Sequence, residues 1–110
     1  MANTIKLIVF PVKDLDKAKT FYHSFLGVEP YVDGAYYVGY KVGDLEIGLD
    51  PNGQSVVSYI DVDDIESSLK KLEATGATVH MDIKNVGGGL LVAQIKDADG
   101  NILGLRQQSK

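Results

Sequence analysis

The chain has 110 residues, of which 45% are hydrophobic and 24% charged, and its formal net charge is −4. This length is typical of one domain, and the composition is that of a globular protein rather than a disordered or fibrous one. The negative charge and the scattered lysines argue against nucleic acid, because its binding requires a clustered basic surface.

Signals for export or membrane insertion are missing from the sequence. No apolar run reaches the roughly 20 residues of a membrane-spanning helix. The first residues do not resemble a signal peptide, and the chain has no cysteine with which to form a disulfide. We therefore expect a cytoplasmic protein with neither a membrane nor a nucleic acid partner.

The first half of the chain begins with a predicted strand and helix. The apolar run 5–10 predicts a mostly buried strand, which ends at Pro11. Asp14 is expected to be the N-cap of a helix and Gly27 the glycine that closes it. The residues at helical spacing, which should face the core, are Leu15, Ala18, Tyr22, Phe25 and Leu26.

Three further strands are expected before the middle of the chain, at 28–32, 35–42 and 45–49. The turn pairs Asp33-Gly34 and Gly43-Asp44 separate them, and both are typical of hairpins. Pro51-Asn-Gly53 then breaks the pattern and serves as the expected linker.

The second half repeats the same order of elements. A strand is predicted at 56–62, and a helix follows that is capped by Asp63 or Asp64 and ends at Gly76. Strands at 78–85, 90–96 and 102–107 complete the pattern. The sequence therefore predicts one domain over 1–110, built from two βαβββ modules at about 1–51 and 54–110.

Several motifs resemble those of the glyoxalase, bleomycin-resistance and extradiol dioxygenase superfamily, also called the vicinal oxygen chelate superfamily. Val12-Lys-Asp-Leu-Asp-Lys-Ala-Lys-Thr-Phe-Tyr22 and Phe25-Leu-Gly-Val28 resemble its first-helix signature. Ile60-Asp-Val-Asp-Asp-Ile65 resembles the start of its second module, and Asp97-Ala-Asp-Gly-Asn101 resembles the turn before its last strand. The resemblance implies an α+β fold whose modules form a cupped mixed sheet with the helices outside, completed in a homodimer.

The resemblance also implies where a metal ion would bind. Metal enzymes of this family carry His, Gln or Glu on the first and fourth strand of each module. Here the corresponding residues are Leu7, Gly48, Val57 and Gly104, whose side chains cannot donate to a metal. We therefore expect no metal, no cofactor and no glyoxalase or extradiol dioxygenase activity, and we expect open floor space at Gly104.

Strand alternation predicts which side chains share the face of these four positions. Glu46 and Arg106 are the expected polar groups of this face, although they could instead pair with each other or lie at a dimer seam. The predicted ligand-contacting residues are Leu7, Val9, Tyr36, Tyr40, Glu46, Val57, Tyr59, Gly104 and Arg106.

Three functions follow from these observations. The first is a metal-free protein, without catalytic residues, that binds a small aromatic or amphiphilic molecule in the cup. The second is a metal-independent lyase or isomerase that uses Glu46 as a base. The third is a structural or partner-binding module without a ligand. The sequence leaves this choice open because a fold does not determine a function.

Overall fold

The computed structural model describes residues 4–108, which form two compact units. The N-terminal unit comprises Lys6–Val57. The C-terminal unit comprises the described residues from Ser58 onward together with Thr4 and Ile5. Each unit has its own helix and its own hydrophobic core, so we describe them one at a time.

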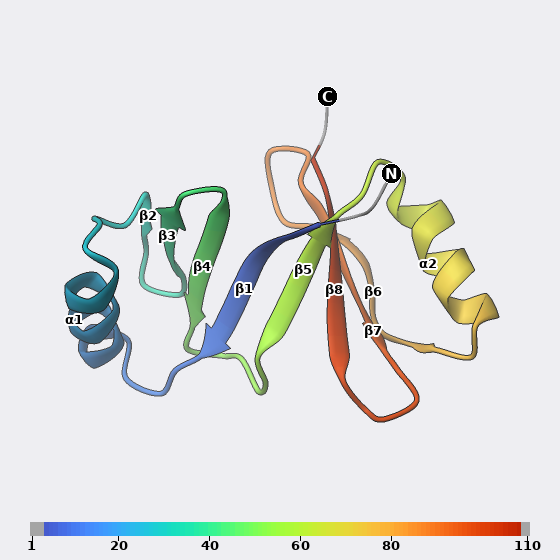
Figure 1. Cartoon of the computed structure of the whole chain (residues 1–110), viewed down its shortest axis with the longest axis horizontal. Helices are drawn as coiled ribbons and strands as arrows, with labels where there is room; N and C mark the ends of the chain where they lie inside the picture. Colours follow the sequence, from blue (N-terminus) through green and yellow to red (C-terminus); the bar gives the residue numbers. More distant parts are fainter. Residues whose placement is uncertain (1–3, 109–110) are drawn as a thin grey trace. The chain divides into compact units, whose positions relative to one another are not determined.

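The N-terminal unit contains one helix and four strands in the order βαβββ (Figure 1). The strands lie side by side in the order β2-β3-β4-β1. β1 and β4 are parallel, whereas β3 is antiparallel to both β2 and β4. The elements are β1 (Ile5–Pro11), α1 (Leu15–Leu26), β2 (Val32–Asp33), β3 (Val38–Val42) and β4 (Leu45–Asp50).

The C-terminal unit repeats this arrangement in the strand order β5-β8-β7-β6. β5 and β8 are parallel, and the other neighbours are antiparallel. The elements are β5 (Val57–Asp61), α2 (Ile65–Ala74), β6 (Thr78–Asn85), β7 (Leu91–Lys96) and β8 (Ile102–Gln107). The predicted α+β class and both βαβββ modules are thereby confirmed.

Both helices begin at the predicted aspartates. The side chain of Asp14 accepts a hydrogen bond from the backbone N–H of Lys17 at 3.1 Å, and Asp64 accepts one from that of Ser67 at 3.1 Å. Gly27 follows α1 with a φ of 73° and donates its N–H to the carbonyl of His23. These bonds satisfy backbone groups that a helix leaves unpaired at its ends.

The strand predicted at 28–32 is wrong for most of its length, since β2 contains only Val32–Asp33. Pro30 has no N–H to contribute to a strand ladder, which explains why pairing starts late. The N–H of Tyr31 donates to the carbonyl of Gly39 at 2.9 Å, and Gly39 is also the ladder partner of Val32, the first residue of β2. The segment before β2 is therefore a loop that passes beside β3.

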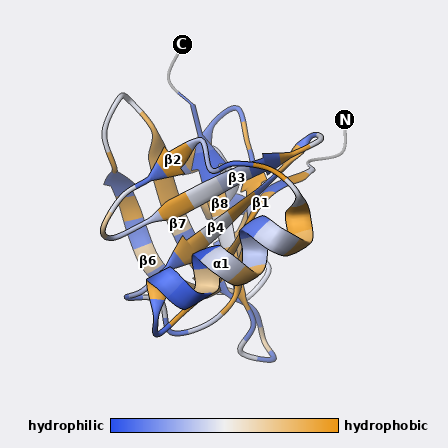
Figure 2. Cartoon of the chain, turned by 90° about the vertical axis from the view of Figure 1, so that its left-hand side faces the viewer, coloured by the Kyte–Doolittle hydropathy of each residue, from blue (hydrophilic) through white to orange (hydrophobic). Residues whose placement is uncertain are grey.

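The core of the N-terminal unit lies between α1 and one face of its strands. Figure 2 shows α1 in front of the strands of this unit, and apolar residues of β1, β3 and β4 belong to the cluster on which the helix packs. The fully buried residues are Val38, Tyr40 and Leu49, and the apolar helix residues that pack on this cluster are Leu15, Ala18, Tyr22 and Leu26.

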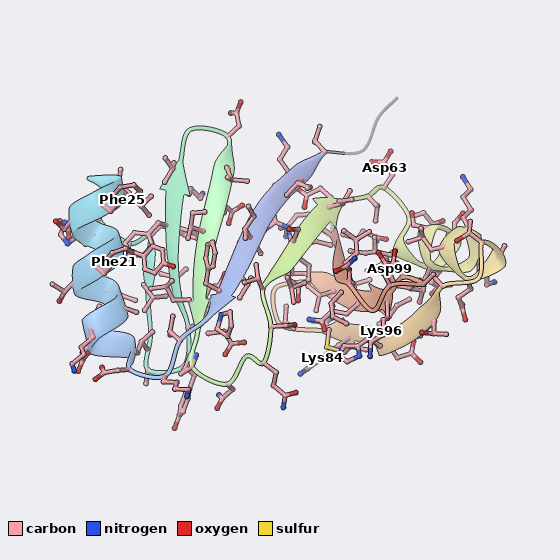
Figure 3. All side chains as sticks on the ribbon, turned by 60° about the horizontal axis from the view of Figure 1, so that its bottom comes forward. Phe21, Phe25, Asp63, Lys84, Lys96 and Asp99 are labelled. Carbon is pink, nitrogen blue, oxygen red and sulfur yellow. The ribbon has the colours of Figure 1, made fainter. Side chains whose placement is uncertain are left out.

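Phe25 does not belong to this buried stripe, so that part of the helix prediction is wrong. Its side chain is 79% exposed and stacks on that of Phe21, with ring centroids 6.2 Å apart. The two rings lie one turn apart on α1 (Figure 3). Phe25 directly precedes Leu26, which packs on the core and is partly buried, and adjacent helix residues point about 100° apart, which turns Phe25 away from the sheet.

The core of the C-terminal unit lies between α2 and one face of β7 and β8. Its buried residues are Val62, Ile65, Leu69, Ala93, Ile95 and Leu105. The backbone N–H of Ile65, at the start of α2, donates to Oε1 of Gln107 at 2.7 Å, which ties the helix to the end of β8. Neither helix in the described part of the chain has the length and apolarity that a membrane crossing requires.

Candidate functional site

The predicted site residues lie largely on the sheet face that is turned away from each helix, which we call the far face. In the N-terminal unit Ile8 and Ile47 pack on the helix side. Because neighbouring strand residues point to opposite faces, Leu7 and Glu46 lie on the far face. The same alternation places Val9 and Gly48 there.

Two glycines form the floor of the far face in the N-terminal unit. Gly39 and Gly48 are direct partners in the ladder of β3 and β4, and we call this pair the glycine floor. A β-carbon built on Gly39 would lie 3.0 Å from Cε1 of Tyr31, and one on Gly48 would lie 2.1 Å from Oη of Tyr37. Two phenol rings therefore occupy the space that side chains at these positions would fill.

Glu46 lies beside Tyr31 and is partly buried. The hydroxyl of Tyr31 donates a short hydrogen bond to Oε1 of Glu46. Lys41, the cross-strand partner of Glu46, holds its Nζ 4.8 Å from the centre of the Tyr31 ring. A carboxylate, an ammonium group and an aromatic ring thus meet at one edge of the glycine floor.

The C-terminal unit has a corresponding arrangement around Gly104. Tyr59 on β5 and Gln94 on β7 are the ladder partners of this glycine on either side. A β-carbon built on Gly104 would lie 2.3 Å from Cδ1 of Tyr59, so the ring crosses directly above it. Nε2 of Gln94 donates to the Tyr59 hydroxyl at 2.8 Å, which holds the ring in this place.

Arg106 makes a two-point ion pair on the same far face. Its Nε lies 2.7 Å from Oδ1 of Asp61 and its Nη2 lies 3.1 Å from Oδ2. The two residues are partners in the ladder of β5 and β8. The side chain of Arg106 is only 13% exposed and that of Asp61 is 44% exposed, so the pair fixes the guanidinium in one orientation.

The prediction of open floor space at Gly104 is wrong. The ring of Tyr59 covers Gly104, and the Tyr37 hydroxyl covers Gly48. In strands, a glycine often marks a place where another group approaches closely. The sequence shows these glycines inside predicted strands, and this signal could have indicated that other side chains cover them.

The aromatic residues of the N-terminal far face differ from the predicted ones. Tyr40 pairs with Ile47 and is fully buried on the helix side, where its hydroxyl lies 3.4 Å from the carbonyl oxygen of Lys19. Tyr36 precedes β3 and is 77% exposed. Tyr31 and Tyr37 supply the rings instead, and both lie outside the strands of the structure although the predicted strands 28–32 and 35–42 contain them. The prediction chose Tyr36 and Tyr40, and Tyr40 lies on the opposite face, the one that α1 covers.

Burial also changes the acidity of Tyr40. Its removal from water raises the pKa of the phenol above the ordinary value, and the ammonium group of Lys19 partly opposes this rise. Tyr40 is therefore a neutral core residue at physiological pH. Its position beneath α1 keeps it away from any molecule on the far face.

The four positions that would hold a metal ion do not fit one. Leu7 and Val57 are buried aliphatic residues, and the two glycines have no side chain. First-row metals require imidazole, thiolate or carboxylate donors. Within residues 4–108, no group of three or more His, Asp or Glu side chains is placed so that it could hold a metal ion.

Comparison with known proteins gives one family. The sequence model of the Glyoxalase/Bleomycin resistance protein/Dioxygenase superfamily matches residues 4–105. This match spans both units. Among curated protein sequences, none matches the chain.

Solved structures with the same fold include a hypothetical protein from Bacillus halodurans, with a TM-score of 0.83, 15% identity and coverage of 100% of this chain and 97% of that one. Methylmalonyl-CoA epimerase from Mycobacterium tuberculosis has a TM-score of 0.70 and 16% identity, covering 96% and 88%. The Mn(II)-bound glyoxalase from Novosphingobium aromaticivorans has a TM-score of 0.73 and 19% identity, covering 96% of this chain and 40% of the glyoxalase. At these identities the likeness concerns the fold alone.

Proposed function

Because the chain belongs to the glyoxalase, bleomycin resistance protein and dioxygenase superfamily, we propose that it is a metal-free member that binds a small organic molecule. The binding surface is the far face of the strands, which each unit presents around its fourth-strand glycine, Gly48 or Gly104. The proposal includes a homodimer and a cytoplasmic location, as the sequence led us to expect.

The observation that carries this proposal is the replacement of metal ligands by glycine and tyrosine. Side chains of Tyr37 and Tyr59 fill the space above Gly48 and Gly104, where a metal-binding member would place donors. A phenol ring offers apolar contact and one hydrogen-bonding group at its tip. Such a surface suits an organic molecule, since ligand sites are mostly apolar with a few placed polar groups.

The remaining residues of the far faces have the same character. Leu7, Val57 and Tyr59 are apolar or aromatic and each is less than 10% exposed. Val9 lies beside Gly48 in the ladder of β1 and β4. Glu46 and Arg106 supply the charged groups, each already held in place by a neighbour. We propose that these residues contact the ligand, together with Tyr31 and Tyr37 in place of Tyr36 and Tyr40.

Metal analysis and thermal shifts test this function. We expect the purified protein to carry no stoichiometric divalent ion, and its unfolding temperature to rise with particular aromatic or amphiphilic compounds. A ligand at 100 times its dissociation constant stabilises the folded state by about 2.7 kcal/mol. A stoichiometric metal, or a screen in which no compound raises the unfolding temperature, would contradict the proposal.

A matched pair of variants locates the binding surface. Glu46→Gln removes one negative charge from the far face, whereas Glu73→Gln removes one from the exposed surface of α2. We expect the first variant to weaken the binding of a charged hit and the second to leave it unchanged. Equal effects would place the ligand elsewhere.

A metal-independent lyase or isomerase is the second candidate, with Glu46 as its base. The partial burial of Glu46 beside Tyr31 is the observation that favours it, since such a carboxylate lies within reach of a bound molecule. Turnover of a bound compound that Glu46→Gln abolishes without loss of binding would establish this function in place of simple binding.

A further inference from the structure

The ring of Tyr31 lies next to a positive charge in the structure itself. Nζ of Lys41 lies 4.8 Å from the ring centroid, within the distance over which an aromatic face attracts a cation. The hydroxyl of the same ring donates to Glu46. One tyrosine thus connects an ammonium group above its face to a carboxylate at its edge.

We propose that Tyr31, Tyr37 and Glu46 form a binding site for a quaternary ammonium group on a small organic ligand. This inference rests on the proposed function and names the chemical class of its ligand. Lys41 occupies the aromatic face when no ligand is bound, and an organic cation displaces it.

The geometry of the glycine floor supports this assignment. Gly39 and Gly48 are paired on neighbouring strands, so the two phenol groups that cover them lie next to each other. Glu46 lies on the same face of β4, two residues before Gly48, and its carboxylate accepts the hydrogen bond of the Tyr31 hydroxyl. Two phenol groups and one carboxylate are the groups that recognise a methylated ammonium, whose charge is spread over an apolar surface.

Accessibility and charge agree with this assignment. Tyr31 is 45% exposed and Lys41 is exposed, so the lysine can leave the ring without breaking the core. The chain as a whole carries a net charge of −4, which favours the approach of a cation. The ammonium group of Lys41 is strongly hydrated, whereas a quaternary ammonium loses little hydration when it contacts an aromatic ring.

Because Lys41 competes with the ligand for the Tyr31 ring, its removal should increase the affinity for an organic cation. Lys41→Met removes the ammonium group that occupies the ring but keeps a side chain of similar length. We expect this variant to bind an organic cation about 2 to 5 times more tightly, the factor that corresponds to an exposed cation–π contact. Removal of a binding residue would have the opposite effect.

The test compares choline with 3,3-dimethylbutan-1-ol, which has the same shape and a carbon in place of the charged nitrogen. Binding is followed by NMR titration of the full-length protein, using the backbone amide signals of Gly39, Lys41 and Gly48. We expect choline to bind and to shift these signals, and the neutral alcohol to bind at least several-fold more weakly.

Four variants complete the experiment. Glu46→Gln and Tyr31→Leu should weaken choline binding, whereas Tyr31→Phe, which keeps the ring, should retain more of it than Tyr31→Leu. Lys71→Met on α2 is the control for Lys41→Met, because it removes the same charge from an exposed position in the other unit. A gain in Lys71→Met equal to that in Lys41→Met would show a general charge effect and overturn the role of Lys41.

The outcomes separate this inference from the proposed function. If both probes bind equally, or if neither binds while other organic compounds stabilise the protein, the ammonium site is wrong and the binding function stands. If no organic compound binds, both are wrong.

Discussion

The ring of Tyr59 covers Gly104 so closely that a β-carbon built on the glycine would lie 2.3 Å from Cδ1 of the tyrosine and 2.7 Å from Cγ. Cγ lies on the axis of the Cβ–Cγ bond, so rotation of the ring about that bond does not move Cγ away from position 104. Gly104 and Tyr59 therefore depend on each other, and no larger residue fits at position 104 while Tyr59 stays in place.

Gly104→Ala should consequently destabilise the protein by about 1 to 3 kcal/mol, which is typical of overpacking in a filled site. Urea unfolding measures this free energy. In a Tyr59→Ala background the same glycine substitution should cost little, because the ring that it strikes is gone. Additive effects of the two substitutions would contradict the contact.

Gly48→Ala should cost less than Gly104→Ala. Its nearest neighbour is the Tyr37 hydroxyl, the far end of a flexible side chain that begins in a loop. Replacing glycine by alanine also lowers the entropy of the unfolded chain, which stabilises the fold by about 0.4 to 1 kcal/mol. We expect a net change below about 1 kcal/mol in urea unfolding. A cost as large as that of Gly104→Ala would show that Tyr37 is rigidly held.

Phe25→Gln should change the free energy of unfolding by less than about 0.5 kcal/mol, because the ring is 79% exposed and glutamine is a good helix former. Ile65→Ala is the contrasting variant, since Ile65 is 1% exposed and its truncation should cost about 2 to 5 kcal/mol. Chemical denaturation of both proteins checks the difference. A large loss of unfolding free energy in Phe25→Gln would show that this ring is buried in a core or an interface.

Asp97 should make stability depend on pH in the acidic range. It accepts hydrogen bonds from the backbone N–H and the side-chain amide of Asn101 and from the backbone N–H of Asp99. These bonds, those from Asn101 first, lower its pKa below the ordinary value of 3.8. The stabilisation is present above the unfolded-state value and is lost as the pH falls through the lower folded-state value.

Asp97→Asn should therefore lower the unfolding temperature at neutral pH, and its difference from the parent protein should shrink below a pH of about 4. Asp99→Asn is the control, because Asp99 contributes to this turn the backbone N–H that the substitution keeps. Thermal unfolding followed by circular dichroism from pH 7 to pH 3 checks this. A difference that stays constant with pH would contradict the role of the charge.

Tyr40 should make the stability of the fold depend on pH in the alkaline range. Burial raises its pKa above the ordinary value of 10.0, so the folded state favours the protonated phenol. The resulting stability is present below that value and is lost as the pH rises through the folded-state pKa. Tyr40→Phe should remove this part of the alkaline loss, while the exposed Tyr36→Phe should not. Equal alkaline unfolding curves for Tyr40→Phe and the parent protein would contradict a contribution of Tyr40 to the alkaline loss of stability.

Much of the fold could be predicted from local signals. Asp14, Asp64 and Gly27 mark the helix ends because capping depends on side-chain chemistry within a few residues. Pro30 shows the limit of this approach, since the apolar segment around it predicts a strand that its missing N–H prevents. The cupped form of the sheet and the homodimer remain predictions.

The sequence by itself determined which donors are missing from the site. Leu7, Val57 and the two fourth-strand glycines cannot hold a metal ion in any conformation, because the limitation lies in their covalent chemistry.

Only the tertiary structure decided which side chains fill the space at these positions. Alternation along a strand gives the spacing of side chains on one face but not which face the helix covers, and α1 turned Tyr40 into the core. The rings of Tyr31 and Tyr37 come from loops, although the sequence predicted strand at both positions, because the path of the chain there depends on packing.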